Sequence, residues 1–235
     1  MKTVIIYGVE HKGNTYHAVQ LFKEQLNILE NDITEFFLPK DLPYFCGGCG
    51  NCILNGEESC PHHSYVSPII SAMEKADFII LASPVFAFRV TGQMKAFLDH
   101  FAFQLIGHRP NETMFSKMAL VVTTGFAIGV KSTIKDMSMN LRFWGIGNIY
   151  KFGFPLFAIK WNDIPIKNKL KIENKIKIIS KKIKLRMNKK LKPDFLIKRV
   201  FNMCKSMQKK TDLFPHDKQY WIKKGWLDKN CPWKK

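Results

Sequence analysis

Short apolar runs alternate with segments of helical periodicity along the first two thirds of this chain, and this alternation restricts the fold more than any other feature. The runs that we expect to form strands cover residues 3–7, 34–38, 77–82, 117–123 and 148–154. Apolar residues at helical spacing follow between them, over residues 15–29, from about 65, over 92–103 and over 133–144. Such alternation is typical of a parallel, doubly wound α/β sheet, whose ligand site lies beyond the carboxyl ends of the strands.

The composition fits one globular domain with an extension. The chain has 235 residues, of which 46% are hydrophobic and 13% aromatic, so it can bury a sizeable core, and disorder or a small disulfide scaffold is excluded. No apolar run approaches the roughly 18 residues of a membrane helix, and the N-terminal segment turns polar too early for a signal peptide. We therefore expect no transmembrane segment and a cytoplasmic location.

The net charge of +18 is concentrated in the C-terminal third. Residues 160–235 hold 24 of the 37 Lys and Arg but only 6 of the 19 Asp and Glu, so the rest of the chain is neutral. Within this part Ile172, Ile176, Ile179 and Ile183 recur at helical spacing, which predicts an amphipathic helix packed on the sheet with its lysines in water. A basic module for nucleic acid or a membrane surface is the lower-ranked alternative. Nucleic acid is the less favoured partner because the aromatic residues of the tail do not interleave regularly with the basic ones.

Three loops at predicted strand ends carry residues suited to a cofactor. The first, residues 8–15, is a glycine-containing turn that enters a helix, where backbone N–H groups and the helix dipole attract a phosphate. The second begins at Ser83 and continues with an apolar stretch that can lie against a flat ring, and the third begins at Thr123 after the fourth strand. The predicted cofactor-binding residues are His11, Lys12, Gly13, Asn14, Thr15, Ser83, Pro84, Val85, Phe86, Ala87, Phe88, Thr123, Thr124 and Gly125.

Together these motifs resemble the flavodoxin-like family of NAD(P)H-dependent FMN reductases and iron-sulfur flavoproteins. The resemblance rests on the 7–15 turn, on residues 83–99 and on a cysteine loop. It implies FMN, with its phosphate on the first loop, its isoalloxazine ring on residues 84–88 and its pyrimidine edge near residues 123–125. We assign no protein acid or base, because the flavin carries the redox chemistry. Relatives usually have Ser or Thr where this chain has Val9, and often Arg where it has His100.

The cysteine loop contains Cys46, Cys49, Cys52 and Cys60 in the spacing C-x2-C-x2-C-x7-C. Clustered cysteines in a chain without a secretory signal indicate metal or redox chemistry. This loop resembles the compact motif of iron-sulfur flavoproteins, which implies a four-iron, four-sulfur cluster held by these four residues. Zinc and free, redox-active thiols remain alternatives. His62 and His63 are substitute ligands only if a cysteine is not used.

We therefore expect a flavodoxin-like FMN-binding domain over residues 1–190, with the cysteine loop at 46–60 after the second strand, and a basic, aromatic extension over 191–235. The expected activity passes electrons between NAD(P)H or ferredoxin and a small-molecule or protein acceptor through FMN and the cluster. A cluster-free NAD(P)H-dependent FMN or quinone reductase is the main alternative. A homodimer or higher homo-oligomer is expected, and an acidic ferredoxin would suit the basic C-terminal face.

Overall fold

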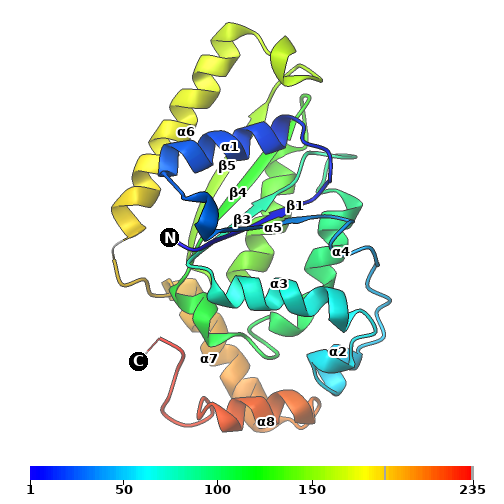
Figure 1. Cartoon of the computed structure of the whole chain (residues 1–235). Helices are drawn as coiled ribbons and strands as arrows, with labels where there is room; N and C mark the ends of the chain where they lie inside the picture. The colour runs from blue at the N-terminus through cyan, green and yellow to red at the C-terminus, as the bar shows by residue number, and fades with distance from the viewer. Residues whose placement is uncertain (188, 234–235) are drawn as a thin grey trace.

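The centre of the molecule is a parallel sheet of five strands. The computed structural model describes residues 1–187 and 189–233 (Figure 1). The strand order is β2-β1-β3-β4-β5, which is the flavodoxin-like order. The strands are β1 (Thr3–Tyr7), β2 (Ile33–Phe37), β3 (Phe78–Ala82), β4 (Met118–Gly125) and β5 (Asn148–Pro155). All residues of β1 and β3 are buried, because helices cover both faces of the sheet, and the predicted doubly wound sheet is confirmed.

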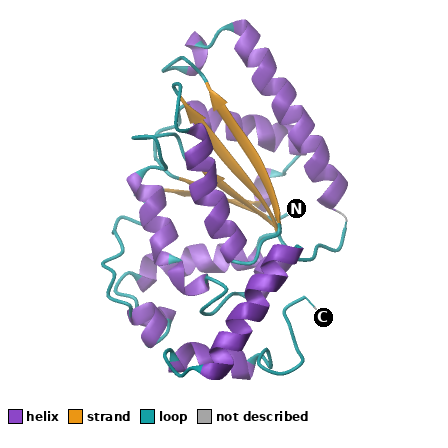
Figure 2. Cartoon of the chain, turned by 180° about the vertical axis from the view of Figure 1, so that it is seen from behind, coloured by secondary structure: helices purple, strands orange, loops and turns teal. Residues whose placement is uncertain are grey.

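Helices form a layer on each face, as Figure 2 shows from behind. One layer consists of α1 (Asn14–Leu26) and α6 (Ile166–Met187). The other consists of α3 (His63–Lys75), α4 (Gly92–His100) and α5 (Val130–Phe143). Each layer shares a separate hydrophobic core with its face of the sheet. Because all the strands are parallel, the three loops that were predicted at strand ends emerge at one edge.

The lysine-rich helix α6 belongs to the first layer. Its residues Ile172, Ile176 and Ile183 are buried in the core beneath β4 and β5, and Ile179 is partly buried beside them. The lysines between them lie mostly on the exposed face. The prediction that the apolar stripe of this segment packs on the sheet is therefore confirmed, and the remaining charged face is open to solvent.

Two helices end earlier than their apolar spacing predicts. Helix α1 stops at Leu26 because Asn27 adopts the left-handed conformation, with φ of 54°, and its N–H bonds back to the carbonyls of Glu24 and Lys23. Leu29, which the helical pattern included, is consequently 69% exposed. Helix α4 ends at His100, and a 3-10 turn follows at Ala102–Gln104.

The C-terminal extension packs against the sheet domain at the end opposite the strand-end loops. Helices α7 (Phe195–Lys210) and α8 (Pro215–Lys223) contribute Phe201 and Trp221 to a core that also contains Ile106 and Phe115 of the sheet domain. The indole N–H of Trp221 donates to the carbonyl of His108 at 2.6 Å. The aromatic tail is therefore docked. None of the helices in the described ranges is long and apolar enough to cross a membrane.

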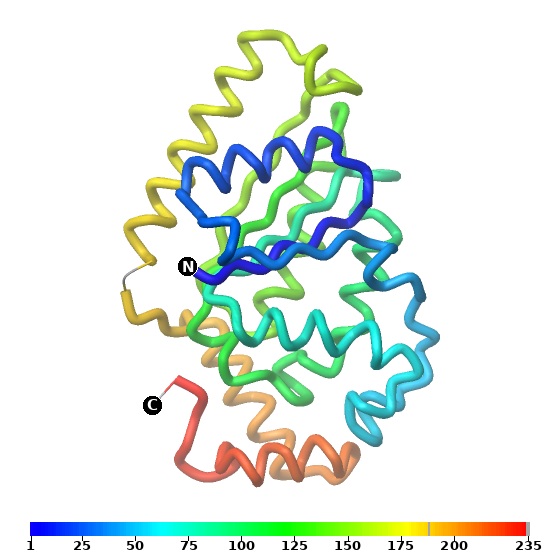
Figure 3. The backbone as a smooth tube through the Cα atoms, in the orientation of Figure 1, coloured from blue at the N-terminus to red at the C-terminus, as the bar shows by residue number. Residues whose placement is uncertain are grey.

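The chain from β2 to α3 connects the two ends of the molecule. Figure 3 traces it along one side of the sheet domain to the short helix α2 (Asn51–Leu54), which lies beside α8 (Figure 1). A 3-10 turn at Glu57–Ser59 follows before α3 begins. The cysteine loop thus has contacts with α8 of the C-terminal extension, which is more than 150 residues further along the chain.

Candidate active site

A cavity of about 300 Å³ lies at the carboxyl ends of the strands. The turn after β1, the first turn of α1, the loops after β3 and β4, and the segment after β5 enclose it. Its wall is formed by Val9, His11, Gly13, Asn14, Thr15, Tyr16, Pro84, Val85, Phe86, Thr124, Gly125, Phe126, Leu156, Ala158 and Ile159. Its volume is at the lower end of the roughly 300–1,000 Å³ usual for small-molecule sites. The three predicted loops do form one pocket.

The first turn of α1 supplies the anion-binding end of this cavity. Gly13 is the N-cap residue, and because glycine has no side chain it offers no acceptor to the N–H groups of the turn. These groups and the positive end of the helix dipole suit a phosphate. The Asn14 amide donates to the carbonyl of Ile159 at 2.8 Å, and the Thr15 hydroxyl lies 2.7 Å from that of Thr124. Both side chains therefore tie the pocket together, and an anion would rely mainly on the backbone.

The loop after β3 forms an apolar wall with an unusual backbone. Phe86 and Arg89 exchange two backbone hydrogen bonds of 3.0 Å, and the two residues between them, Ala87 and Phe88, have φ of 44° and 66°. Left-handed residues that are not glycine cost about 1–3 kcal/mol each and are concentrated at functional sites. The amide of Val85 donates to the carbonyl of Thr124 at 2.9 Å, so the wall is fixed to the end of β4.

Hydrogen bonds join this loop to the turn after β1. The hydroxyl of Thr91 donates to the carbonyl of Gly8 at 2.7 Å, and the hydroxyl of Ser83 accepts from the amide of Thr91 at 3.1 Å. A Cβ on Gly8 would lie 2.7 Å from the Thr91 hydroxyl, so only glycine fits this approach. The two loops that would hold the phosphate and the ring are therefore one rigid unit.

Several residues predicted from sequence lie outside the cavity wall. The Lys12 ammonium is 5.3 Å from the ring centroid of Tyr16 and 5.9 Å from that of Phe37. Ser83 is fully buried and stabilises the loop, while Ala87 and Phe88 form its turn. Thr123 is buried, and by the alternation of strand side chains it faces the opposite side from Thr124. The remaining predicted residues, His11, Gly13, Asn14, Thr15, Pro84, Val85, Phe86, Thr124 and Gly125, line the cavity.

Sequence reasoning missed the wall segment after β5. Leu156, Ala158 and Ile159 form one side of the cavity, together with Val9, Tyr16 and Phe126 from the predicted loops or beside them. The segment carries no motif. The rule that ligands bind beyond strand ends, applied to the fifth strand as well, would have identified it.

The cysteine loop is an open turn beside α4. Cys46 and Cys49 are exposed and Cys52 and Cys60 are half-buried, while Gly48 and Gly50 have left-handed φ of 66° and 72°. Burial raises the pKa of the Cys52 thiol, and the nearby thiols Cys60, Cys46 and Cys49 act in the same direction, whereas Arg109 lowers it. The thiols of Cys60, Cys46 and Cys49 thus influence that of Cys52, and thiolates are ligands that suit a soft metal group.

Arg109 holds the cysteine loop against the C-terminal extension. Its guanidinium donates to the carbonyls of Cys52 and, at 3.2 Å, Ile53, and it forms ion pairs with Glu57 at 3.0 Å and with Asp217 on α8. The Arg109 side chain is 4% exposed and that of Asp217 is 0% exposed. A buried guanidinium with this many partners fixes the position of α2 relative to α8.

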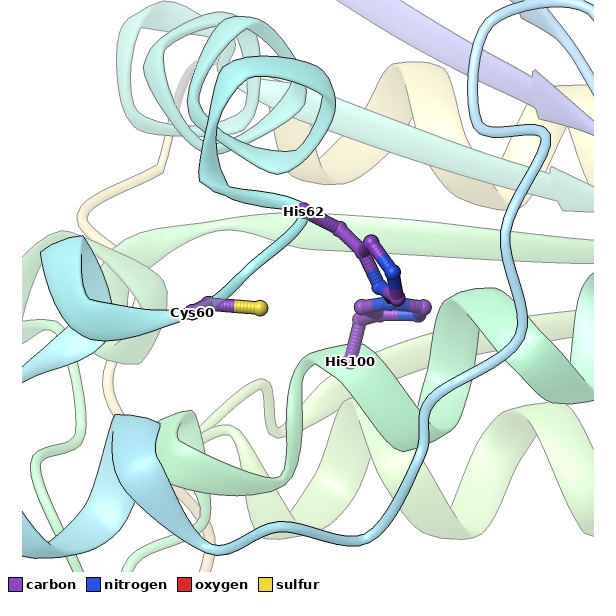
Figure 4. Close-up of side chains that lie close together, drawn as sticks. All are labelled: Cys60, His62 and His100. Carbon is purple, nitrogen blue, oxygen red and sulfur yellow. Dashed lines mark hydrogen bonds between the residues drawn. The ribbon is translucent and has the colours of Figure 1, made fainter.

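A compact group of three potential ligands lies at the other end of the loop. The side chains of Cys60, His62 and His100 converge between the loop and α4 (Figure 4), with their ligand atoms within 4.8 Å of one another. Nδ1 of His62 is 2.9 Å from Nε2 of His100, and Nδ1 of His100 is 2.8 Å from the carbonyl of Ala96. Burial lowers the pKa of His100, and His62 adds to this effect. The four cysteines do not form such a tight group in the described chain.

Comparison with known proteins places the chain in a family. The model of the NADPH-dependent FMN reductase family matches residues 1–152, so the chain belongs to that family. It is an NAD(P)H-dependent FMN oxidoreductase, and the cavity fits FMN, with an open helix N-terminus for the phosphate and an apolar wall for the ring.

Individual proteins of known name are also similar to this chain. An iron-sulfur flavoprotein of Archaeoglobus fulgidus is 31% identical over 173 residues, which are 71% of this chain and 74% of that protein. An iron-sulfur flavoprotein of Methanocaldococcus jannaschii is 39% identical over 103 residues, covering 42% and 51% of the two chains. The solved structure of an FMN-dependent NADH-azoreductase from Bacillus anthracis in complex with FMN has a similar fold, with a TM-score of 0.58, 14% identity and coverage of 78% and 99%.

Proposed function

We propose that this enzyme passes electrons between NAD(P)H or ferredoxin and a further acceptor through FMN and a four-iron, four-sulfur cluster. The observation that carries the proposal is the place of the cysteine loop, which follows β2 and lies against α4. A Cβ on Gly92, the first residue of α4, would lie 3.9 Å from the ring of Phe45. The loop therefore flanks the residues that join the two walls of the FMN cavity.

The residues around the cavity have distinct roles towards FMN. The N–H groups at the start of α1 and the nearby His11 would hold the phosphate, and Pro84, Val85 and Phe86 would lie along the ring. The backbone of Thr124 and Gly125 would meet its polar edge. When bound, FMN supplies the exchange of a hydride with a nicotinamide and of single electrons with a one-electron carrier.

The cluster would be held by Cys46, Cys49, Cys52 and Cys60. Two points support this set: the four cysteines have the close spacing C-x2-C-x2-C-x7-C, and the left-handed Gly48 and Gly50 give the loop the tight path that such ligands need. The chain is also similar over most of its length to a protein named an iron-sulfur flavoprotein. Arg109, which donates to the carbonyl of Cys52, would keep the loop in place as the cluster is assembled.

The basic face of α6 supports a protein donor or acceptor of opposite charge. The isoleucines of α6 pack in the core, and most of its lysines lie on the exposed face, where they could bind an acidic partner such as ferredoxin. Nucleic acid is not favoured. If reduction by ferredoxin is fast at low salt and slows as ionic strength rises, this partner is supported, and a rate that does not depend on salt overturns it.

A homodimer is also proposed. Exposed apolar side chains, Phe86, Phe126, Phe157 and Ile159, are 56–84% exposed at or beside the mouth of the cavity. Apolar surface around a site is typical of an interface between copies. Sedimentation velocity over a range of concentrations tests this, and a monomer throughout would contradict it.

The alternative is a cluster-free FMN reductase acting on quinones. The observation that favours it is that the tight ligand group of the loop consists of Cys60 and two histidines instead of the four cysteines. In that case the exposed apolar side chains at the mouth of the cavity would bind a flat acceptor.

One experiment separates the two. The protein is purified without oxygen, its ultraviolet-visible spectrum is recorded, and iron and acid-labile sulfide are measured on the same sample. Flavin bands with about four iron and four sulfide per chain support the cluster enzyme. Flavin bands without iron, also after anaerobic reconstitution with iron and sulfide, support the cluster-free reductase. Protein that neither contains nor takes up FMN overturns both.

A further inference from the structure

The inference concerns Cys60, His62 and His100 (Figure 4), which the flavin chemistry does not use. His62 and Cys60 belong to the loop that enters α3, and His100 is the last residue of α4. His62 and His100 are 38 residues apart in the sequence, and the fold brings their imidazoles and the Cys60 thiol together. Figure 4 shows the three side chains directed into the same gap between the loop and the helix.

The hydrogen bonds fix which ring nitrogen of His100 is free to act as a ligand. Nδ1 of His100 is 2.8 Å from the Ala96 carbonyl, which can only accept, so Nδ1 carries the proton. Nε2 of the neutral ring then has a free electron pair, and it faces His62 at 2.9 Å. Histidines that bind metals usually donate their other N–H to a carbonyl in this way, which orients the ring.

His62 is also held in place. Its ring stacks on Tyr44, with centroids 4.6 Å apart and an interplanar angle of 6°, and the Tyr44 ring in turn meets the edge of Tyr65. The ligand atoms of Cys60, His62 and His100 are all within 4.8 Å of one another. Thiolate and imidazole ligands lie about 2.0–2.3 Å from a zinc ion, so small side-chain rotations bring the three atoms to a common ion.

We propose that Cys60, His62 and His100 form a binding site for one divalent transition-metal ion of the zinc type, which shares only Cys60 with the proposed four-thiolate cluster. Thiolate together with imidazole is the donor combination that zinc prefers. On binding, the Cys60 thiol releases its proton to solvent, and the proton on Nδ1 of His62 moves to Nε2, so that both nitrogens present lone pairs.

The site and the cluster exclude each other because one thiolate, Cys60, would serve both. The cysteine loop then has two alternative occupants: a cluster on four cysteines, or a single ion on one cysteine and two histidines. The exclusion rests on the proposed cluster, whereas the single-ion site stands without it.

The test uses the full chain with bound iron removed by anaerobic chelation, in the presence of a reductant that does not bind metals. Cobalt chloride is the probe, because a thiolate bound to cobalt gives a charge-transfer band in the near ultraviolet. We expect one cobalt per chain, displaced by one equivalent of zinc. FMN binding is measured for every variant to establish that it is folded.

Variants assign the ligands. We expect His62→Ala and His100→Ala each to weaken cobalt binding by more than about 100-fold, since even groups that only orient a ligand are worth about 10- to 100-fold. The matched control is His63→Ala: the adjacent His63 has its Nδ1 3.0 Å from the carbonyl of Glu57 and is outside the group. Cys46→Ala should also leave cobalt binding unchanged.

Wild-type affinity in both His62→Ala and His100→Ala overturns the proposal, as does loss of cobalt binding in Cys46→Ala with retention in the two histidine variants. Because His100 is buried and its variant can fail to fold, His62→Ala, at a half-exposed position, decides in that case. Anaerobic reconstitution with iron and sulfide, run on the same variants, should fail in Cys46→Ala and succeed in His100→Ala. A wild type that binds cobalt but never takes up iron and sulfide overturns the cluster and supports the single-ion site.

Discussion

Removing the Asp217 carboxylate tests how firmly the C-terminal extension holds the cysteine loop. Asp217 is fully buried on α8, where it pairs with Arg109 and lies 2.7 Å from Nδ1 of His108. In Asp217→Ala the buried guanidinium keeps Glu57 at 3.0 Å and the backbone carbonyls of the loop. Breaking one partner of a buried ion pair costs about 3–5 kcal/mol, and because other partners remain we expect about 3 kcal/mol.

This loss is large compared with a total unfolding free energy of about 5–15 kcal/mol, and it corresponds to a fall in Tm of about 6–12 °C for a chain of this size. Urea unfolding followed by circular dichroism measures it, with the change read from the midpoint at a constant slope. Asp217→Asn keeps the shape of the side chain, and we expect it to lower the unfolding free energy less than Asp217→Ala does. With the proposed cluster bound, the same variants should lose iron on exposure to air faster than the wild type, because Arg109 also donates to the Cys52 carbonyl.

The matched control is Asp212→Ala, which removes an ion pair with Lys218 in the same extension. The Asp212 side chain is 83% exposed, and exposed pairs contribute about 0–1 kcal/mol. If Asp217→Ala costs no more than Asp212→Ala, then Arg109 does not depend on α8, and the reasoning that links the extension to the loop fails.

Three further changes test the packing of the site and of the C-terminal extension. Gly8→Ala places a Cβ 2.7 Å from the Thr91 hydroxyl, so we expect a loss of about 1–3 kcal/mol in unfolding free energy and weaker FMN binding; wild-type values for both would contradict the rigid junction. Phe201→Ala removes a fully buried ring from the core of the extension and should cost about 3–5 kcal/mol by urea unfolding, whereas a loss below about 1 kcal/mol would mean that the extension is not docked. Asn14→Ala removes the bond to the Ile159 carbonyl, worth about 1 kcal/mol, and should raise the Kd for FMN about fivefold in a fluorescence titration; an unchanged Kd would mean that this bond does not shape the cavity.

The elements of the fold could be predicted because the core pattern is local. The runs that became β1, β3 and β4 are continuous and apolar since both of their faces are covered by helices. Helix ends were less predictable. Leu29 continues an apolar stripe, yet the backbone of Asn27 turns left-handed and ends the helix before it.

The candidate site was predictable as a set of loops but not as a set of side chains. Glycine, proline and strand ends indicate where the chain turns, so residues 8–15, 83–88 and 123–125 were found together. Which side chains face the cavity depends on partners elsewhere in the fold. Lys12 lies over the rings of Tyr16 and Phe37. The Asn14 amide donates to the carbonyl of Ile159. The wall after β5 carries no motif at all.

Sequence by itself determined the alternation of strands and helices, the glycine-containing turn after the first strand and the four closely spaced cysteines, because each depends on residues that are neighbours along the chain. Only the tertiary structure decided that Arg109 joins Cys52 to Asp217 and that His62 meets His100, since these pairs are separated by 38 to 108 residues. The charge of the residues and their spacing along the sequence indicate which groups can interact. The packing of α8 and α4 against the cysteine loop determines which of these groups interact, because a buried charge or imidazole is stable only where the fold supplies its partner.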